Sequence, residues 1–192
     1  MKLVVLGSGS GTNVNSILQE FSKDKLGKVS EISLFSDVKD SGFLKNGKAF
    51  SCYASYLKTC PNRARIVGDY EANWIEEIHS HKPELIVLAG FMKILSRNFI
   101  NFFHGKIINL HPSLLPSFKG LDAIERAFNH GVKITGCTVH WVNDSIDCGQ
   151  IIDQTPVRIF SDDNLEKVIS RVHAAEHYLL PKVIRELSMS PG

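Results

Sequence analysis

Two short, unbroken apolar runs constrain the fold more than any other feature of the sequence. Residues 3–6 and 85–89 consist of leucine, isoleucine, valine and alanine alone. A strand with one face in water alternates apolar and polar residues, so an unbroken run indicates a strand that is buried on both faces. Helices must then cover both faces of the sheet. The sequence therefore predicts an α/β fold built on a mostly parallel, twisted sheet with helices on both faces.

Strands and helices alternate along the first half of the chain, whereas two strands follow each other closely in the second half. Strand–helix–strand units give parallel neighbours, and a short connection between two strands favours an antiparallel pair. We therefore expect an antiparallel strand toward the C-terminal half. Residues 37–62 give no clear pattern beyond a short strand at 50–54. The remaining strands are predicted at 32–35, 106–110, 135–142 and 151–157, and the helices at 13–21, 70–81, 96–103, 121–130 and from a cap at Ser161 onward.

The size and composition restrict the functional classes. A chain of 192 residues is expected to form a single domain over residues 1–192, and its net charge of +2 gives no strong attraction to nucleic acid. No apolar run approaches the length of a membrane span, and the short N-terminal run does not resemble a signal peptide. The four cysteines lack metal-binding spacing, so we expect free thiols in a reducing compartment, and together with the lack of a signal peptide and a membrane span this predicts a cytoplasmic location. Monomer and homodimer both stay open.

An amide and an imidazole stand together at the end of the strand predicted at 106–110. Asn109 and His111 are two positions apart, so their side chains face the same side of an extended segment. An amide can donate to a developing oxyanion and an imidazole can move a proton, which suits an acyl-type transfer. The imidazole needs a carboxylate to orient it, and Asp147 fits this role and a plain turn position equally well. The other candidate carboxylates are Asp122, Asp144 and Asp153.

A glycine-rich turn at residues 7–13 follows the first strand and opens the first helix. Glycine lets a backbone approach an anion closely, and a helix N-terminus offers free N–H groups to it. Thr12 stands where the dinucleotide-binding pattern requires its last glycine, and no Walker-type lysine follows. The turn therefore favours a small phosphorylated substrate over NAD or ATP, the alternative being a tight turn that binds nothing.

Other polar residues have simpler explanations from the sequence. His173 and Glu176 share one helix face with a second histidine and could bind a metal, but such a face is more often simply solvated. Lys93 and Arg97, one predicted helical turn apart, could meet an anionic ligand, although two basic residues on a surface helix are usually solvated. His140 alternates with apolar neighbours, which predicts a packed side chain rather than a reactive one.

Four motifs, in order along the chain, resemble those of the phosphoribosylglycinamide formyltransferase family. They are Ser-Gly-Ser-Gly-Thr-Asn at 8–13, Leu-Ala-Gly-Phe-Met-Lys-Ile-Leu at 88–95, Asn-Leu-His-Pro-Ser-Leu-Leu-Pro at 109–116 and Asp-Cys-Gly-Gln-Ile-Ile at 147–152. The resemblance implies a Rossmann-like formyltransferase fold with a phosphate-binding N-terminal half and a folate-binding, catalytic C-terminal half. It implies transfer of a formyl group from 10-formyltetrahydrofolate to the amine of 5′-phosphoribosylglycinamide in de novo purine biosynthesis, with no metal and no covalent enzyme intermediate.

The resemblance also assigns roles to individual residues. Asn109, His111 and Asp147 match the catalytic trio of the family, and a cis peptide bond is implied between Leu115 and Pro116. The residues that match the site for the substrate phosphate and glycinamide are Gly11, Thr12, Asn13, Pro112, His173 and Glu176. Those that match the folate site are Met92, Lys93, Ile94, Leu95, Asn109, Asn143, Asp144, Ser145, Ile146 and Asp147, with Arg63 or Arg65 for the glutamate tail.

Three alternatives share parts of this pattern. A formyltetrahydrofolate hydrolase would use the same trio but is expected to carry an additional N-terminal regulatory domain. A methionyl-tRNA formyltransferase is expected to carry an additional basic C-terminal domain. A nucleotide-binding module without enzymatic activity would explain the glycine-rich turn and leave Asn109, His111 and Asp147 without a role. We expect small-molecule partners, with no nucleic acid and no membrane among them.

Overall fold

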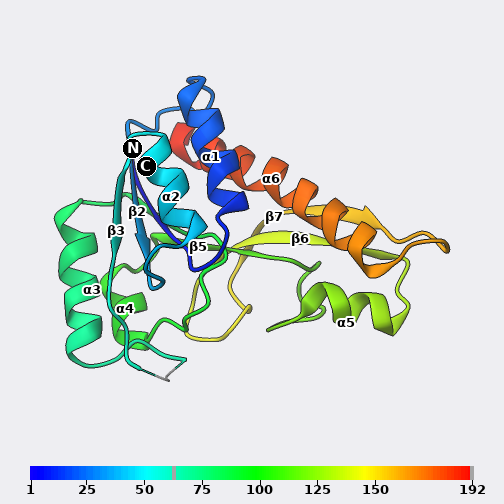
Figure 1. The fold of residues 1–192 in the computed structure, drawn as a ribbon. Coiled ribbons are helices and arrows are strands. Elements are labelled where there is room, and N and C mark those ends of the chain that lie inside the picture. The colour runs from blue at the N-terminus through cyan, green and yellow to red at the C-terminus, as the bar shows by residue number, and fades with distance from the viewer. Residues whose placement is uncertain (62–63, 191–192) are drawn as a thin grey trace.

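The fold is a seven-stranded sheet covered by helices (Figure 1). The computed structural model describes residues 1–61 and 64–190. The strand order is β3-β2-β1-β4-β5-β6-β7; β1 to β5 pair in parallel, and β6 runs antiparallel to both β5 and β7. This confirms the predicted sheet, including its antiparallel strand toward the C-terminal half. The strands are β1 (Lys2–Leu6), β2 (Glu31–Ser36), β3 (Tyr53–Tyr56), β4 (Leu85–Leu88), β5 (Ile107–His111), β6 (Ile134–Trp141) and β7 (Ile151–Arg158).

Helices cover both faces of the sheet, as predicted. The first two helices and the last one lie on one face, and the third and fourth lie on the other (Figure 1). The fifth packs against the last helix beyond the antiparallel strands. Among the helices of the described residues, none combines the length and apolar character needed to cross a lipid bilayer. The helices are α1 (Thr12–Ser22), α2 (Gly42–Ala49), α3 (Asp69–Ser80), α4 (Arg97–Phe102), α5 (Ala123–His130) and α6 (Leu165–Met189).

The unbroken apolar runs are explained by two cores, one on each face of the sheet. Successive side chains of a strand point to opposite faces. Leu3 and Val5 of β1 pack in the core beneath α1, α2 and α6. Val4 and Leu6 pack in the core beneath α3 and α4, beside Trp74. Because burying one such side chain is worth about 1.5–3 kcal/mol, a polar residue in either run would weaken one of the two cores.

The helix α2 lies in the segment 37–62, where the sequence predicted no helix. Both of its glycines, Gly42 and Gly47, are positions of close packing. A Cβ on Gly42 would lie 2.4 Å from the carbonyl oxygen of Ser10, and a Cβ on Gly47 would lie 2.5 Å from Leu34 Cδ1. The glycines therefore let α2 lie directly against the glycine-rich turn and β2, a constraint that exists only in the folded chain.

The start of α6 was predicted incorrectly. Ser161 does not cap this helix; Asn164 does, and its side-chain oxygen accepts a hydrogen bond from the Lys167 N–H at 3.0 Å. The reason lies in the turn before it. The Asp163 carboxylate accepts a hydrogen bond from the Phe160 N–H at 2.7 Å, so the chain completes a turn before it enters the helix.

The strand order places three connecting segments along one edge of the sheet. β1, β4 and β5 are parallel neighbours, so their carboxyl ends meet at that edge. The chain leaves β1 toward β2 on one side and leaves β4 toward β5 on the other, which creates the crevice where open α/β sheets bind ligands. The segments that follow these strands are the glycine-rich turn, residues 89–96 and residues 112–122.

We predict that Gly42→Ala lowers the free energy of unfolding by about 1–3 kcal/mol, because the new Cβ would meet the carbonyl oxygen of Ser10. Gly9→Ala is the matched control, since a Cβ at Gly9 meets no atom within 4 Å. Urea unfolding of both variants measures the difference. Equal stability of the two variants would contradict the close approach of α2 to the turn.

Candidate active site

Asn109, His111 and Asp147 form one cluster, called the buried cluster because the side chains of His111 and Asp147 are only 6% and 8% exposed. The first two lie on β5, and Asp147 lies in the loop between β6 and β7. His111 Nδ1 lies 3.3 Å from Asp147 Oδ2, and Asn109 Nδ2 donates to Asp147 Oδ1 at 3.4 Å. Two of the other candidate carboxylates are engaged elsewhere, because Asp144 pairs with Arg97 and Asp153 pairs with Lys182. The structure thus brings together the three residues that the sequence analysis proposed as a group.

Asp147 is held as a carboxylate. Burial alone would raise its pKa, but a hydrogen bond with His140, the N–H of Gly120 and the charges of His111 and His140 together lower the pKa below its usual value. The Gly120 N–H donates to Oδ2 at 2.8 Å. The backbone of Asp147 adopts a left-handed conformation, with φ at 49°. A buried negative charge therefore faces His111.

The His111 ring has an oxygen acceptor at each nitrogen. Nδ1 faces the Asp147 carboxylate, and Nε2 lies 3.0 Å from the carbonyl oxygen of Phe118. A neutral imidazole has one N–H, whereas an imidazolium has two. The two oxygens can therefore both accept a hydrogen bond from the ring only when both nitrogens carry a hydrogen.

His140 belongs to this cluster, although its sequence pattern predicted only a packed side chain. It lies directly opposite Asn109 in the antiparallel pair of β5 and β6. Its Nε2 lies 3.3 Å from Asn109 Nδ2 and 3.6 Å from Asp147 Oδ1, and its Nδ1 lies 2.9 Å from the carbonyl oxygen of Trp141. The side chain is buried, as predicted, but it also touches two of the three proposed catalytic residues. Only the register between the strands reveals this.

The loop after His111 is fixed by residues that the sequence analysis did not single out. Thr138 Oγ1 donates to the carbonyl oxygen of Ser113 at 2.6 Å and accepts from the N–H of Leu115 at 3.1 Å. Gln154 donates to the carbonyl oxygen of Leu115 at 3.0 Å. The Leu115–Pro116 peptide bond is cis, which confirms the expectation from the resemblance. Pro112 opens this bend, and the bend carries Phe118 to His111.

The glycine-rich turn leaves the N-terminus of α1 uncovered. Gly11 precedes the helix with φ at 79°, and a Cβ there would lie 2.6 Å from Phe43 Cα. The first turn of α1, which begins at Thr12 and Asn13, contains no acidic residue, and no side chain caps it. Its N–H groups and helix dipole are therefore suited to bind an anion.

Glu176 is a buried carboxyl beside this turn. Asn13 Nδ2 donates to Glu176 Oε2 at 3.3 Å, whereas the other amide atom, Asn13 Oδ1, is buried without a partner among the described residues. Burial raises the pKa of Glu176 to about 7, although the hydrogen bond from Asn13 opposes this. The carboxyl therefore titrates close to neutral pH, in contrast to Asp147.

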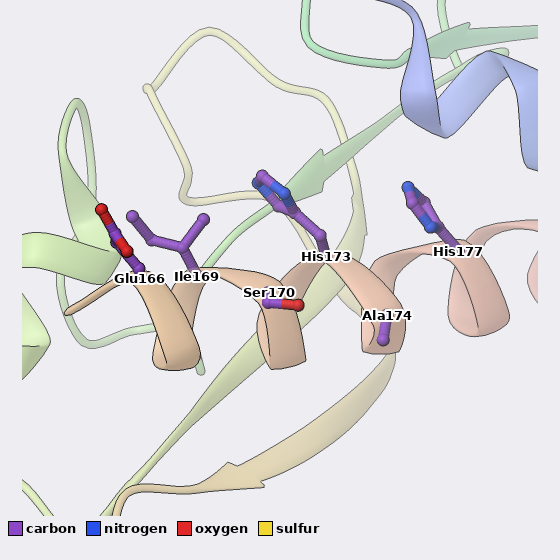
Figure 2. Close-up of a pocket in the computed structure, with 6 residues that line it drawn as sticks. All are labelled: Glu166, Ile169, Ser170, His173, Ala174 and His177. Atoms are coloured by element: carbon purple, nitrogen blue, oxygen red, sulfur yellow. The ribbon is translucent and has the colours of Figure 1, made fainter. Parts of the chain in front are cut away.

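His173 lies on α6 near Glu176 but on its open side. Figure 2 shows the rings of His173 and His177 pointing to the same side of the helix, beside Glu166 and Ile169. These residues line an open hollow of ≈ 490 Å³. Within the described residues, no three or more His, Cys, Asp and Glu side chains are placed to hold a metal ion. Glu176 points into the fold instead and is bonded to Asn13.

Two segments that match the folate site face solvent with apolar side chains. Met92, on the segment after β4, is 65% exposed, and Ile146, in the loop after β6, is 54% exposed. The side chain of Ser8 links the first segment to the glycine-rich turn, because its Oγ donates to Asp37 at 2.5 Å and accepts from the Met92 N–H at 2.9 Å. The other residues that match the folate site are Lys93, Ile94 and the buried Leu95 in the segment after β4, and Asn143, Asp144 and Ser145 in the loop after β6.

Three basic residues of the described part of the chain, Arg65, Lys93 and Arg97, lie in or beside the segment after β4. Arg65 pairs with Ile94 in an isolated parallel bridge, so it borders the segment after β4; Arg63 lies outside the described residues. Lys93 and Arg97 were predicted to lie one helical turn apart, but they do not share a helix, because α4 begins at Arg97.

Comparison with known proteins agrees with this architecture. The formyl transferase family model matches residues 1–184. Phosphoribosylglycinamide formyltransferase from Bacillus subtilis is 37% identical over 188 residues, which cover 97% of this chain and 94% of that protein. The crystal structure of glycinamide ribonucleotide transformylase 1 from Symbiobacterium toebii is 34% identical, with a TM-score of 0.89 over 98% of this chain and 87% of that chain. The crystal structure of phosphoribosylglycinamide formyltransferase from Bacillus halodurans is 32% identical, with a TM-score of 0.90 over 99% of this chain and 96% of that chain.

These similarities extend over nearly the whole chain and include the segments that carry the buried cluster and the glycine-rich turn. The seven-stranded, mostly parallel sheet with its antiparallel strand thus matches the fold of these solved structures. The chain belongs to the formyl transferase family.

Proposed function

We propose that this chain transfers the formyl group of 10-formyltetrahydrofolate to the amine of 5′-phosphoribosylglycinamide, a step of de novo purine biosynthesis. The observation that carries this proposal is the buried cluster of Asn109, His111 and Asp147 beside an uncovered helix N-terminus. The cluster has the groups that a formyl transfer requires, and the helix N-terminus suits the phosphate of the acceptor. Small molecules are its proposed partners and the cytoplasm its proposed location.

The acceptor spans the glycine-rich turn and α6. Its phosphate lies on the free N–H groups of Gly11, Thr12 and Asn13. Its glycinamide extends past Pro112 and His173 toward Glu176. The buried Asn13 Oδ1 has no partner among the described residues, so it can accept a hydrogen bond from an N–H of the acceptor.

The formyl donor lies between the two segments that border the cluster. The pterin packs between residues 92–95 and residues 143–147, where the exposed side chains of Met92 and Ile146 gain an apolar partner. Arg65, beside Ile94, is placed to meet a carboxylate of the glutamate tail. Asn109 borders the donor from β5. This arrangement points the formyl group at His111.

The reaction proceeds by direct attack of the glycinamide amine on the formyl carbon. A new C–N bond forms and the carbonyl oxygen becomes an oxyanion, which Asn109 and protonated His111 stabilise. The contact from Asn109 to Asp147 is long, at 3.4 Å, so the amide can turn its N–H to the oxyanion. Losing one such donor costs about 3 kcal/mol of barrier.

Collapse of this intermediate breaks the bond between the formyl carbon and N10 of the folate. The attacking nitrogen loses a proton and N10 gains one, with His111 and Asp147 as the relay. The Asp147 carboxylate stabilises the imidazolium form of His111 throughout. The route uses no metal and no covalent enzyme intermediate, and holding the amine near the formyl carbon supplies much of the remaining acceleration.

An assay with 10-formyl-5,8-dideazafolate tests this function. Release of the deformylated folate is monitored with and without phosphoribosylglycinamide. We expect release only when the amine is present. Release without the amine would indicate a hydrolase, and the absence of release under both conditions would favour a binding module without enzymatic activity.

Asp147→Asn should reduce kcat by roughly 10²–10⁴-fold while binding of both substrates is largely kept, because the amide cannot stabilise a charged His111. Asp153→Asn is the matched control, since Asp153 pairs with Lys182 away from the cluster. Steady-state kinetics and substrate binding measure the two effects. Near-normal kcat in Asp147→Asn would overturn the assignment of Asp147.

Glu176 should make the folded protein less stable as pH rises. Its pKa is about 7 in the folded chain and 4.5 when exposed, so the folded state binds more protons between these values and the free energy of unfolding falls as pH rises through that window. The loss amounts to about 3 kcal/mol. We expect Glu176→Gln to be more stable than the natural chain at pH 8 by this order and to lose the advantage at pH 4. Urea unfolding at both pH values measures this, and a difference independent of pH would contradict it.

A further inference from the structure

The loop between β6 and β7 divides into two parts with different anchors. The part that holds Asp147 and Cys148 is tied to the neighbouring loop, because Gly120 N–H donates to Asp147 and Lys119 Nζ lies 2.8 Å from Cys148 Sγ. The tip, residues 143–146, is folded mainly on itself. The N–H of Ser145 donates to the side chain of Asn143 at 3.0 Å, and Asn143 donates to the carbonyl oxygen of Cys148 at 3.3 Å.

The tip is joined to the opposite wall by an ion pair. Arg97 Nε lies 2.8 Å from Asp144 Oδ2. Arg97 is the first residue of α4, and α4 directly follows the segment 92–95. The ion pair therefore connects the two walls between which the pterin is placed. Because Arg97 belongs to α4, the ion pair restrains the tip relative to a helix rather than relative to another loop.

The start of α4, which carries Arg97, is fastened to α3 by hydrogen bonds on both sides of Arg97. Ser96 caps α4, since its Oγ accepts from the Phe99 N–H at 3.1 Å, and the same hydroxyl donates to the buried carboxylate of Glu71 on α3. Asn98 donates to the other oxygen of Glu71 at 3.2 Å. Arg97 thus stands between two residues that are both fastened to α3, and its backbone has little freedom to follow a moving loop.

We propose that Arg97 is a positioning residue that holds the tip of the 143–149 loop against the donor pocket. The inference rests on the proposed function, because only that function identifies the pocket as the site of the formyl donor. The restraint of the tip by Arg97 is independent of the function. Arg97 touches neither the buried cluster nor the proposed phosphate site, so its effect falls on the affinity for the formyl donor. A planar guanidinium fixes the direction of its hydrogen bond to a carboxylate better than an ammonium does.

The exposure of the Arg97–Asp144 ion pair determines how much the loss of Arg97 should change the affinity for the formyl donor. The Arg97 and Asp144 side chains are 77% and 44% exposed. Exposed ion pairs contribute little and are screened by salt, so removing Arg97 should change the affinity for the donor about two- to fivefold. The same weakness allows the tip to open for substrate entry and product release.

The test compares Arg97→Gln and Arg97→Lys with the natural chain. Lys2→Gln is the matched control, because Lys2 forms an ion pair of the same 2.8 Å length with Glu31, with the side chains 45% and 48% exposed, away from the site. We expect Arg97→Gln to raise KM for 10-formyl-5,8-dideazafolate about two- to fivefold at low salt, with kcat and KM for phosphoribosylglycinamide within about twofold. Arg97→Lys should restore part of the affinity, and the difference should vanish at about 1 M salt.

Hydrogen exchange of the peptide that spans residues 143–149, without substrates, separates the inference from the proposed function. We expect faster exchange in Arg97→Gln and unchanged exchange in Lys2→Gln. If the natural chain shows no formyl transfer, the proposed function fails, while the exchange experiment still tests the restraint. Unchanged exchange, or an unchanged KM for the donor in an active Arg97→Gln variant, overturns the inference.

Discussion

The antiparallel pairing of β6 with β5 is the interaction on which the candidate site depends. It sets His140 opposite Asn109 and Thr138 opposite His111. Thr138 then binds the bend after His111, and His140 lies against Asn109 and Asp147. β6 ends with Trp141 opposite Ile108, and the loop that follows it folds back so that Asp147 contacts Asn109 and His111.

Two buried carboxyls near this edge have their pKa values shifted in opposite directions. Burial would raise both, and the difference lies in their partners. Asp147 has two histidines and a backbone N–H, which lower its pKa. Glu176 has one amide donor, and its pKa rises to about 7. Opposite shifts suit separate tasks: Asp147 stays charged beside His111, and Glu176 exchanges protons near neutral pH beside the proposed position of the acceptor amine.

The sequence predicted those parts of the site that depend on local periodicity. The two-residue spacing placed Asn109 and His111 on one side of a strand, and the unbroken apolar runs predicted a sheet covered on both faces. Asp147 could not be separated from a turn residue, because its partners come from a different strand and a different loop. The burial of His140 was predicted, but its contacts with Asn109 and Asp147 were not, since alternation reveals the face of a strand and not the residue across from it. The segment that forms α2 gave no clear pattern, because the role of its glycines is close contact with Ser10 and Leu34, which exists only in the folded chain.

A crystal structure with a folate analogue and phosphoribosylglycinamide bound together would show whether both substrates meet at His111. We expect the phosphate on the N–H groups of Gly11, Thr12 and Asn13, and the glycinamide nitrogen about 3–3.5 Å from the position of the formyl carbon beside His111. A phosphate bound away from the N-terminus of α1, or an amine that cannot reach the carbon beside His111, would contradict this expectation.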